Sequence, residues 1–395
     1  MPRSRIALAC LSALLTLTVG CGSEPETSVD TSALDPGNYP TAPRDLSTLR
    51  TEDGGAVRES IRLGGLVPLP MDLDSWLVFG RTNFAGHHYT ARNPPHRGSG
   101  ISNLENFAEQ VPGLVAGWHT GGSRRAKRTF GLDVSVGLLR FTTPEQATNA
   151  MHVLADASAE QYPPKQPLEI PGYPTGRTSL TAYDSVQSWT AQGDYLLWTF
   201  ISDGLATPPD PGPLLAFAKK LFDRQFELLR GFSPTPVGEL ANAPLDDLLT
   251  RTLAAERPGT LDDVTGAYTV PAALHLESRP DLARRAFEDA KVDLVAYAGT
   301  RVYRAGDTAA AARLTAFLAA QAPSAYDPIA APPGLPEARC FREDPGPPQS
   351  ARIILEHRCY LSHDRYVAEV TANQPQDLAQ RVSAQYLLLT HGEEG

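Results

Sequence analysis

Two cysteines and two histidines near the end of the chain could do metal or redox chemistry together. They are Cys340, His357, Cys359 and His363, and two sulfurs with two nitrogens form a donor set that zinc accepts. On a strand, however, His357 and Cys359 would point to one face at a spacing that fits a zinc ion poorly. A disulfide between Cys340 and Cys359 is the favoured prediction if the chain is exported, and zinc is the alternative.

The first twenty residues have the three zones of an export signal. Arg3 and Arg5 precede an apolar run from Ile6 to Val19, and Gly20 supplies a small residue at its end. The apolar run of about 14 residues is too short to span a bilayer. We therefore predict a signal peptide over residues 1–20 and an extracytoplasmic mature chain, in a compartment where disulfides persist.

The segment Leu17–Cys21, with the sequence LTVGC, resembles the lipobox of bacterial lipoproteins. The resemblance implies that the Cys21 thiol carries a diacylglyceryl group, begins the mature chain and anchors it to the outer face of the membrane. Thr18 departs from the aliphatic residue usual at its position, so cleavage by an ordinary signal peptidase that leaves Cys21 free stays open. Because Cys10 leaves with the signal, the two C-terminal cysteines are the pair left to bond.

The residue patterns that mark common catalytic sites are missing from the sequence. The nearest approach to a serine hydrolase elbow, His96–Gly100 (HRGSG), does not fit Gly-x-Ser-x-Gly. The zinc-protease pattern, the phosphate-binding loop and the dinucleotide fingerprint are missing too. We therefore predict no catalytic residue, no cofactor and no metal site, and we favour a non-catalytic binding protein. A hydrolase that acts on the cell envelope through dispersed acidic residues is the alternative.

The histidines gather in one region of the first half. His87 and His88 are adjacent, with His96 and His119 further along. Adjacent side chains on a strand point to opposite faces, which rarely suits one metal ion. Surface or interface histidines are favoured, and a loop that binds metal or senses pH is the alternative.

Four basic residues stand close together in an otherwise acidic chain. Arg124, Arg125, Lys127 and Arg128 follow a glycine-rich turn, whereas the chain as a whole has 35 basic and 45 acidic residues and a formal charge of −10. The overall acidity argues against nucleic acid as a partner. For the cluster we favour a solvated loop that answers nearby carboxylates, and a contact with anionic lipid headgroups is the alternative.

An internal repeat predicts the elements that hold these residues. In the first half a strand leads to a helix capped by Thr143, and in the second half a strand region leads to a helix capped by Asp307. The same offset aligns Arg140 with Arg304. A hairpin and another helix follow in each half, so we predict an α+β protein of two tandem two-layer sandwich domains, each with an antiparallel sheet under two helices.

Length and composition predict how the chain is divided into domains, a tether and a linker. About 375 mature residues exceed one ordinary core, so two domains are expected. Residues 21–45 are polar and lack an apolar period, which predicts a tether to the membrane. The proline-containing segment Ser233–Pro236 predicts a linker. We expect the first domain to cover residues 46–232 and the second to cover residues 237–392.

Three stretches carry a resemblance to a family. Leu34–Arg44 (LDPGNYPTAPR), followed by Arg58–Leu63 (RESIRL), is similar to the opening of an uncharacterised family of actinobacterial secreted lipoproteins, and Val302–Arg304 with the paired-cysteine tail resembles that family's C-terminal half. The resemblance implies a secreted, lipid-anchored protein and supplies no functional residues. We therefore expect a protein on the extracytoplasmic face of the membrane that binds a ligand or protein partner of the cell envelope, in the cleft between its halves.

Overall fold

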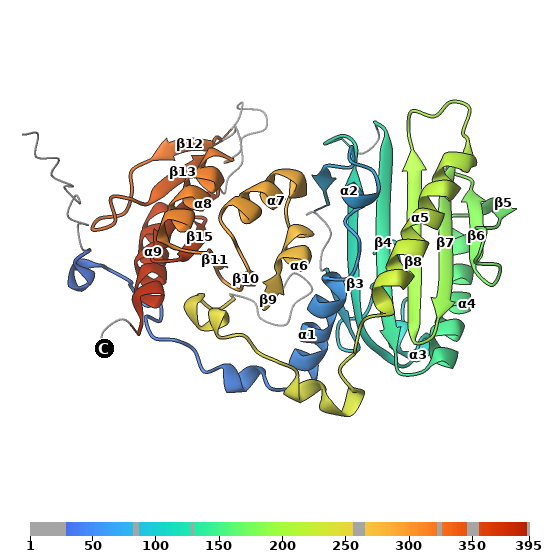
Figure 1. Ribbon diagram of the computed structural model, residues 1–395, viewed down its shortest axis with the longest axis horizontal. Helices are drawn as coiled ribbons and strands as arrows, with labels where there is room; N and C mark the ends of the chain where they lie inside the picture. The colour runs from blue at the N-terminus through green and yellow to red at the C-terminus, as the bar shows by residue number, and fades with distance from the viewer. Residues whose placement is uncertain are drawn as a thin grey trace, which may run out of the picture.

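The computed structural model describes residues 29–81, 87–127, 130–255, 265–321, 326–345 and 355–392. These residues form two antiparallel sheets, one on the right and one on the left in Figure 1. The predicted signal at residues 1–20 and the predicted lipidation site Cys21 lie outside the described residues. Within the described ranges, every helix is too short or too polar to cross a membrane.

The first half contains an eight-stranded sheet. Its helix α4 begins as predicted, because Thr143 and Gln146 form a capping box and Pro144 occupies the first turn. Its strands are β1 (Phe79–Gly80), β2 (His88–Thr90), β3 (Leu114–Ser123), β4 (Leu132–Phe141), β5 (Pro164–Leu168), β6 (Arg177–Thr181), β7 (Ser185–Gln192) and β8 (Tyr195–Asp203). Its helices are α1 (Glu52–Gly64), α2 (Pro70–Leu73), α3 (Phe107–Gln110), α4 (Pro144–Gln161) and α5 (Pro211–Leu229).

The second half contains a seven-stranded sheet. The side chain of Asp307 caps helix α8 by accepting a hydrogen bond from Ala310 N at 2.7 Å, as predicted. The strands are β9 (Gly266–Thr269), β10 (Leu294–Tyr297), β11 (Arg301–Arg304), β12 (Tyr326–Ile329), β13 (Arg339–Glu343), β14 (His357–His363) and β15 (Tyr366–Ala372). The helices are α6 (Val270–Leu274), α7 (Pro280–Asp289), α8 (Thr308–Ala320) and α9 (Pro375–Thr390), and short 3-10 helices are η1 (Thr31–Ala33), η2 (Leu46–Leu49), η3 (Val237–Asn242) and η4 (Asp247–Arg251).

The two sheets have the same strand order. The first runs β1-β3-β4-β8-β7-β6-β5, with β2 also paired to β3, and the second runs β9-β10-β11-β15-β14-β13-β12. Arg140 pairs with Tyr195 across β4 and β8, and Arg304 pairs with Tyr366 across β11 and β15. The alignment of Arg140 with Arg304 therefore holds in the strand register. The α+β class, the tandem antiparallel sheets packed with helices and the internal repeat are confirmed.

The two long helices of each half lie on opposite faces of their sheet. In the first half α4 belongs to the cluster that contains Trp198, whereas α5 belongs to the cluster that contains Leu197. In the second half α8 packs on the side of Val367 and α9 on the side of Ala368. Both helices of a half were predicted to lie on one face of the sheet, which differs from this arrangement. The difference arises because β8 and β15 are apolar on both faces, which is typical of strands covered on both sides.

The segment before α1 is packed against the second half. Leu34 is buried in the core of that half, the Tyr39 hydroxyl donates to Asp377 Oδ1 at 2.6 Å, and Arg44 Nε donates to Leu249 O at 3.0 Å. The prediction of a free polar tether over residues 21–45 is therefore wrong for residues 29–45. The prediction rested on the polar composition of the segment, which does not reveal the few side chains that anchor it to the second half.

The two halves share one continuous core. A single cluster of buried residues joins the α5 face of the first sheet, helix α1 and the α8 face of the second sheet. Trp118 on β3 and Tyr268 on β9 are fully buried, with ring centres 6.4 Å apart. The predicted linker runs along α1, where Arg62 Nη2 donates to Ser233 O at 2.8 Å. The halves therefore form one packed unit.

Candidate functional site

Helix α1 lies between the two sheets and forms one wall of the candidate site (Figure 1). Thr51 caps its first turn by accepting from Gly54 N at 3.0 Å. Near its other end, a Cβ atom on Gly64 would lie 2.6 Å from the Trp118 ring. The glycine therefore allows α1 to pack closely against β3. This packing fixes the helix at the boundary of the two halves.

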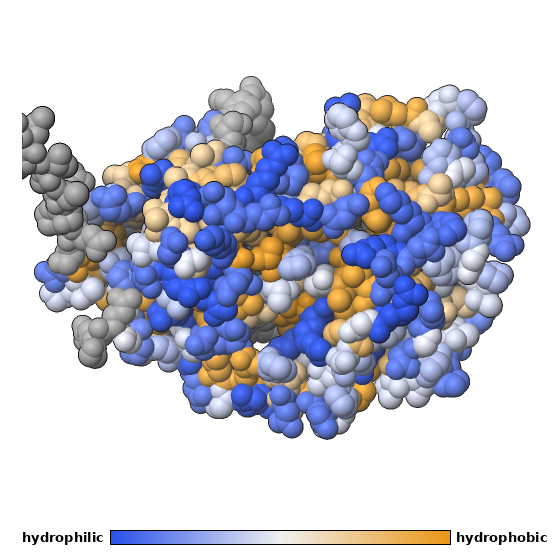
Figure 2. Space-filling model, viewed as in Figure 1, coloured by the Kyte–Doolittle hydropathy of each residue, from blue (hydrophilic) through white to orange (hydrophobic). Residues whose placement is uncertain are grey.

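A groove of about 530 Å³ lies between α1 and the second half. Most of its wall is apolar, with Val57 and Ile61 on α1 facing leucines and alanines of the second half. Figure 2 shows apolar surface between the two halves on the face that looks toward the viewer. The lining residues are Arg44, Leu49, Asp53, Gly54, Val57, Arg58, Ile61, Arg62, His88, Thr90, Arg92, Asn93, Pro244, Leu245, Asp246, Leu249, Ala254, Ala255, Thr265, Gly266, Ala267, Thr269 and Leu294.

Arg58 is a charged side chain of the groove that has no carboxylate partner among the described residues. Its Nη1 donates to Leu49 O at 2.9 Å, and its Nη2 donates to Leu240 O at 3.4 Å and Ala241 O at 3.2 Å. Across the described ranges, every acceptor of this guanidinium is a backbone carbonyl, and the buried Nε has no hydrogen-bond partner. Burial, together with nearby Arg50, lowers the pKa of Arg58. The groove therefore holds a positive charge that a bound anion would stabilise.

The other charged side chains of the groove already have partners. Arg92 pairs with Asp53 at 3.0 Å in an exposed ion pair, and Arg62 pairs with Glu59 at 2.7 Å. Asp246 accepts a backbone hydrogen bond as the N-cap of η4, and burial raises the pKa of its carboxyl. The two lining carboxylates, Asp53 and Asp246, thus serve separate structural contacts.

His88 lines the groove and connects the two halves. Its Nε2 lies 2.6 Å from the Tyr268 hydroxyl of β9, and its Nδ1 lies 3.1 Å from Ser60 Oγ of α1. Ser60 is fully buried and donates to Gly117 O. A hydroxyl sealed in this way cannot reach a substrate in the groove, so the arrangement serves packing and not nucleophilic catalysis.

Two further histidines face Trp118 from opposite halves. The ring centres of His87 and His275 lie 5.3 Å and 5.7 Å from the Trp118 ring, and His88 lies at 5.1 Å. Burial lowers the pKa of His87 to about 4 and that of His275 to about 3, so both are neutral at pH 7. The expectation that His87 and His88 point to opposite faces is wrong, because β2 begins only at His88. Among the residues that the structure describes, no three His, Cys, Asp or Glu side chains gather to hold a metal ion.

Family models match most of the chain. The N-terminal part of a domain of unknown function, DUF7373, matches residues 46–245, and the C-terminal part of the same domain matches residues 248–392. The chain belongs to the DUF7373 family. Both DUF7373 parts contribute to the groove, since Arg58 lies in the first match and Leu294 in the second. The two matches meet after the predicted linker at residues 233–236.

The other comparisons add little to the DUF7373 assignment. No curated protein matches the chain. Among solved structures, the extracellular domain of PknH from Mycobacterium tuberculosis is similar at 12% identity, over 42% of this chain and 96% of that one, with a TM-score of 0.28. At this TM-score the likeness does not establish a shared fold or function.

The predicted disulfide is present in the C-terminal DUF7373 part. Cys340 on β13 and Cys359 on β14 are register partners with Cα atoms 4.1 Å apart, and their sulfurs are bonded. His363 lies instead beside Tyr386 of α9, with ring centres 5.4 Å apart. The cysteines and histidines that were considered as a zinc set are therefore not gathered around one point.

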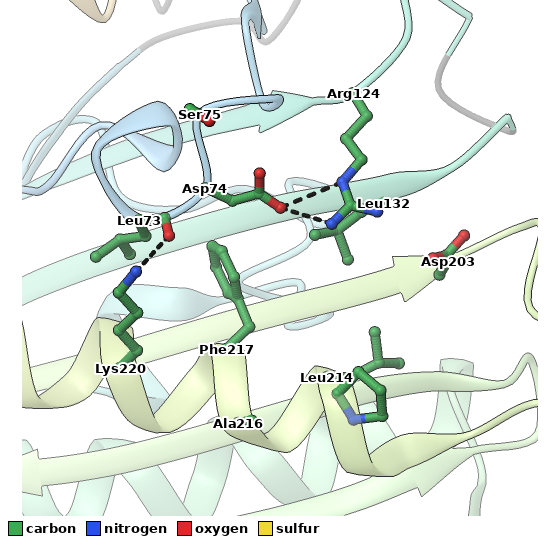
Figure 3. A pocket seen from close by; sticks show the side chains of 11 residues that line it. Leu73, Asp74, Ser75, Arg124, Leu132, Asp203, Leu214, Ala216, Phe217 and Lys220 are labelled. Carbon is green, nitrogen blue, oxygen red and sulfur yellow. Dashed lines mark hydrogen bonds and ion pairs between the residues drawn. The ribbon is translucent and has the colours of Figure 1, made fainter.

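A second cavity, of about 520 Å³, opens beside α5 in the first half (Figure 3). Arg124 pairs with Asp74 at 2.6 Å, and Lys220 Nζ donates to Leu73 O. Figure 3 shows both cations turned toward these partners. Arg124 thus answers a nearby carboxylate, as favoured, whereas Arg128 lies outside the described residues. Because these cations are engaged, we assign this cavity no ligand.

The sequence favoured a ligand site in the cleft between the halves but gave no role to Arg58. One signal was present, since Arg58 stands between Val57 and Ile61 on the apolar side of a helix. The missing information is long-range: Arg58 meets Leu240 and Ala241, which are more than 180 positions away. A single sequence does not show such a contact.

Proposed function

We propose that this protein is a lipid-anchored binding protein of the cell envelope and that the groove beside α1 holds its ligand. The ligand that the groove fits has an apolar body and one anionic group. The observation that carries the proposal is Arg58, a partly buried guanidinium without a carboxylate partner in an apolar groove.

The chemistry of the groove favours such an amphiphilic ligand. A buried charge is costly unless it is paired, so Arg58 stabilises the complex most when a carboxylate or phosphate enters. Val57, Leu245 and Leu249 would cover the apolar part of the ligand and remove it from water. Cavities of several hundred Å³ with few polar groups are typical of small-molecule sites.

The alternative, a hydrolase, receives less support from the same groove. Acid and base catalysis by carboxylates needs two such groups directed at one substrate. Of the lining carboxylates, Asp53 is paired with Arg92, and Asp246 caps η4. Binding without chemistry is therefore the function that we propose.

The anchor is proposed from the sequence. The signal-like residues 1–20 and the lipobox-like LTVGC segment supply the acceptor Cys21, which carries the acyl chains if the proposal holds. Cys21→Ala should abolish labelling of the protein by a fatty-acid analogue and release it from the membrane fraction. Continued labelling of that variant would refute the anchor and leave the groove proposal intact.

The groove is tested with parinaric acid, a fluorescent long-chain fatty acid, and with its methyl ester. Arg58→Gln should raise the Kd of the acid by about 10- to 100-fold, since a hydrogen bond to a charged group contributes roughly 1.5–3 kcal/mol. The Kd of the uncharged ester should not change. Val57→Trp, which fills the groove, should weaken binding of both probes.

The matched control is Arg92→Gln, which removes an exposed cation from the rim of the same groove. It should change the Kd of the acid less than threefold. Thermal unfolding of each variant checks that the fold is retained, because Arg58 also holds backbone carbonyls. Equal binding of the acid to the folded Arg58→Gln variant and to the wild type would refute the ligand assignment.

A further inference from the structure

All the large hydrophobic side chains that the structure describes as exposed lie at one end of the first sheet. They are Trp76 (74% exposed), Phe130 (48%), Tyr183 (66%) and Leu205 (61%). Isolated exposed hydrophobic residues need no explanation, but a group at one place marks an interaction surface. The second half contributes none of them.

The strand register places these four residues together. Ser123 ends β3 and faces Phe79, which starts β1, so Trp76 and Phe130 project beyond the same end of the sheet. Leu132 pairs with Asp203, which puts Leu205 just beyond that end.

Tyr183 belongs to the same end, because Ser185 at the start of β7 pairs with Ser202 near the end of β8. From β1 to β6 the sheet crosses five strand spacings, or about 24 Å. The four side chains therefore stand on four separate loops along a row, which we call the loop row. In Figure 1 the loop between β8 and α5 rises at the upper edge of the right-hand half, and Figure 2 shows apolar surface along that edge.

Basic residues accompany the loop row. Arg124, Arg125 and Lys127 are exposed in the loop between β3 and β4, and Lys127 Nζ lies 4.8 Å from the centre of the Phe130 ring. Within the described ranges, Arg125 and Lys127 form no ion pair. The carboxylates at this end are engaged: Asp74 pairs with Arg124, Asp184 pairs with Lys165, and Asp203 and Asp210 accept backbone hydrogen bonds.

We propose that the loop row is a docking surface for an anionic lipid bilayer. Aromatic side chains with a polar atom, such as Trp76 and Tyr183, favour the boundary between lipid headgroups and acyl chains. Lysine and arginine beside them are attracted to anionic headgroups at about 1 kcal/mol per charge. A lipid surface accommodates side chains that project from four separate loops, whereas a folded partner usually needs a continuous complementary face.

The equivalent end of the second sheet differs, so the exposed loop row is not a general feature of this fold. Its β10–β11 turn is covered, since Gly299 N donates to Leu253 O at 2.9 Å and Gly299 O accepts from Arg381 at 2.6 Å. Among the described residues, the large hydrophobic side chains exposed at this end belong to the first half. The docking surface is distinct from the groove and from the proposed anchor at Cys21.

Trp76 reports on docking without a label. The other three tryptophans, Trp118, Trp189 and Trp198, are at most 2% exposed, so changes on mixing with vesicles come from Trp76. The experiment uses the chain from residue 21 onward with Cys21→Ala, which carries no acyl group. Its emission is followed with vesicles of phosphatidylcholine alone or with 30% phosphatidylglycerol, which is the composition that we choose for the test.

Phosphatidylglycerol vesicles should shift the Trp76 emission to shorter wavelength, and lipids brominated near the headgroup should quench it. Co-sedimentation should fall at least tenfold for Leu205→Ser with Phe130→Ser, and also for Arg125→Glu with Lys127→Glu. Arg313→Glu, an exposed charge reversal on α8 of the second half, is the control and should bind as the wild type does. High salt should weaken binding.

Two outcomes would overturn the proposal. One is that Trp76 neither shifts nor is quenched with anionic vesicles. The other is an emission shift that depends on protein concentration in the absence of vesicles, which would assign the loop row to self-association. Unchanged melting temperatures of the variants show that any loss of binding is not a loss of folding.

Discussion

The two halves of the molecule have the same strand order, but equivalent positions differ in exposure, charge and contacts. In the β3–β4 loop of the first half, the described residues 124–127 and 130 are exposed and include three basic side chains. The β10–β11 turn of the second half is short and is held by Leu253 and Arg381. The second half alone contains the disulfide. The apolar pattern of the strands therefore maintains the topology, while the loops and a few polar side chains give each half its own surface.

Arg140 and Arg304 show the difference at one pair of equivalent residues. Arg140 is buried and pairs with the fully buried Glu59 at 2.8 Å, which also accepts from Thr235 N at 3.1 Å. Arg304 pairs with Asp293 at 2.8 Å, but the Asp293 side chain is 54% exposed. The same strand position therefore carries a buried ion pair in the first half and a solvated one in the second.

The largest expected effect comes from removing the acidic partner of each arginine. Glu59→Gln should lower the free energy of unfolding by about 3–5 kcal/mol, because it leaves Arg140 buried and charged without its carboxylate. Asp293→Asn should cost less than about 1 kcal/mol, because water solvates the exposed pair. Urea unfolding measures both values. Similar costs for the two variants would contradict the contrast between the halves.

The sequence predicted much of this architecture but not the contrast within it. The caps at Thr143 and Asp307 and the strand alignment are local patterns, and the structure confirms them. The packing of Tyr39 and Arg44 on the second half, and the contacts of Arg58, join residues about 180 or more positions apart. Local periodicity contains no information on such contacts, which is why the tether was mispredicted. For the same reason the sequence favoured a site between the halves without identifying Arg58 or the other residues that line it.

An intermediate effect is expected from reduction of the disulfide between Cys340 and Cys359. The bond restricts a loop with a sequence separation of 19, and a loop of this size contributes roughly 3 kcal/mol. Cys340→Ala with Cys359→Ala should therefore lower the free energy of unfolding by about that amount. Denaturing thiol titration of the wild type should find neither sulfur free before reduction.

Unfolding of the same double variant also tests whether the two halves unfold together. Since their core is continuous through α1 and Trp118, a single transition should shift as a whole. A second transition that appears only in the cysteine variant would show that the second half unfolds on its own. Two free thiols in the oxidised wild type would contradict the bridge itself.

A smaller effect than that of the disulfide, dependent on pH, is expected from the histidines that face Trp118. The pKa of His87 is lowered to about 4 and that of His275 to about 3, below the value of about 6.5 expected in the unfolded chain. The unfolded chain therefore binds more protons than the folded protein below pH 6.5, and stability falls as the pH decreases. Each histidine should cost about 1 kcal/mol between pH 6.5 and pH 5.5.

Urea unfolding at these two pH values, with His87→Phe and His275→Gln as variants, separates the two contributions. Each variant should take up at most one proton fewer on unfolding than the wild type does. Its free energy of unfolding should therefore fall less steeply as the pH decreases. His87 belongs to the first half, whereas His275 belongs to the second and is held by Thr120 and Val67 of the first half. Equal losses from the two variants within one transition are expected if the halves unfold together. A loss confined to one variant would mean that only one half opens in that transition, and the shared core around Trp118 would then not couple the two halves.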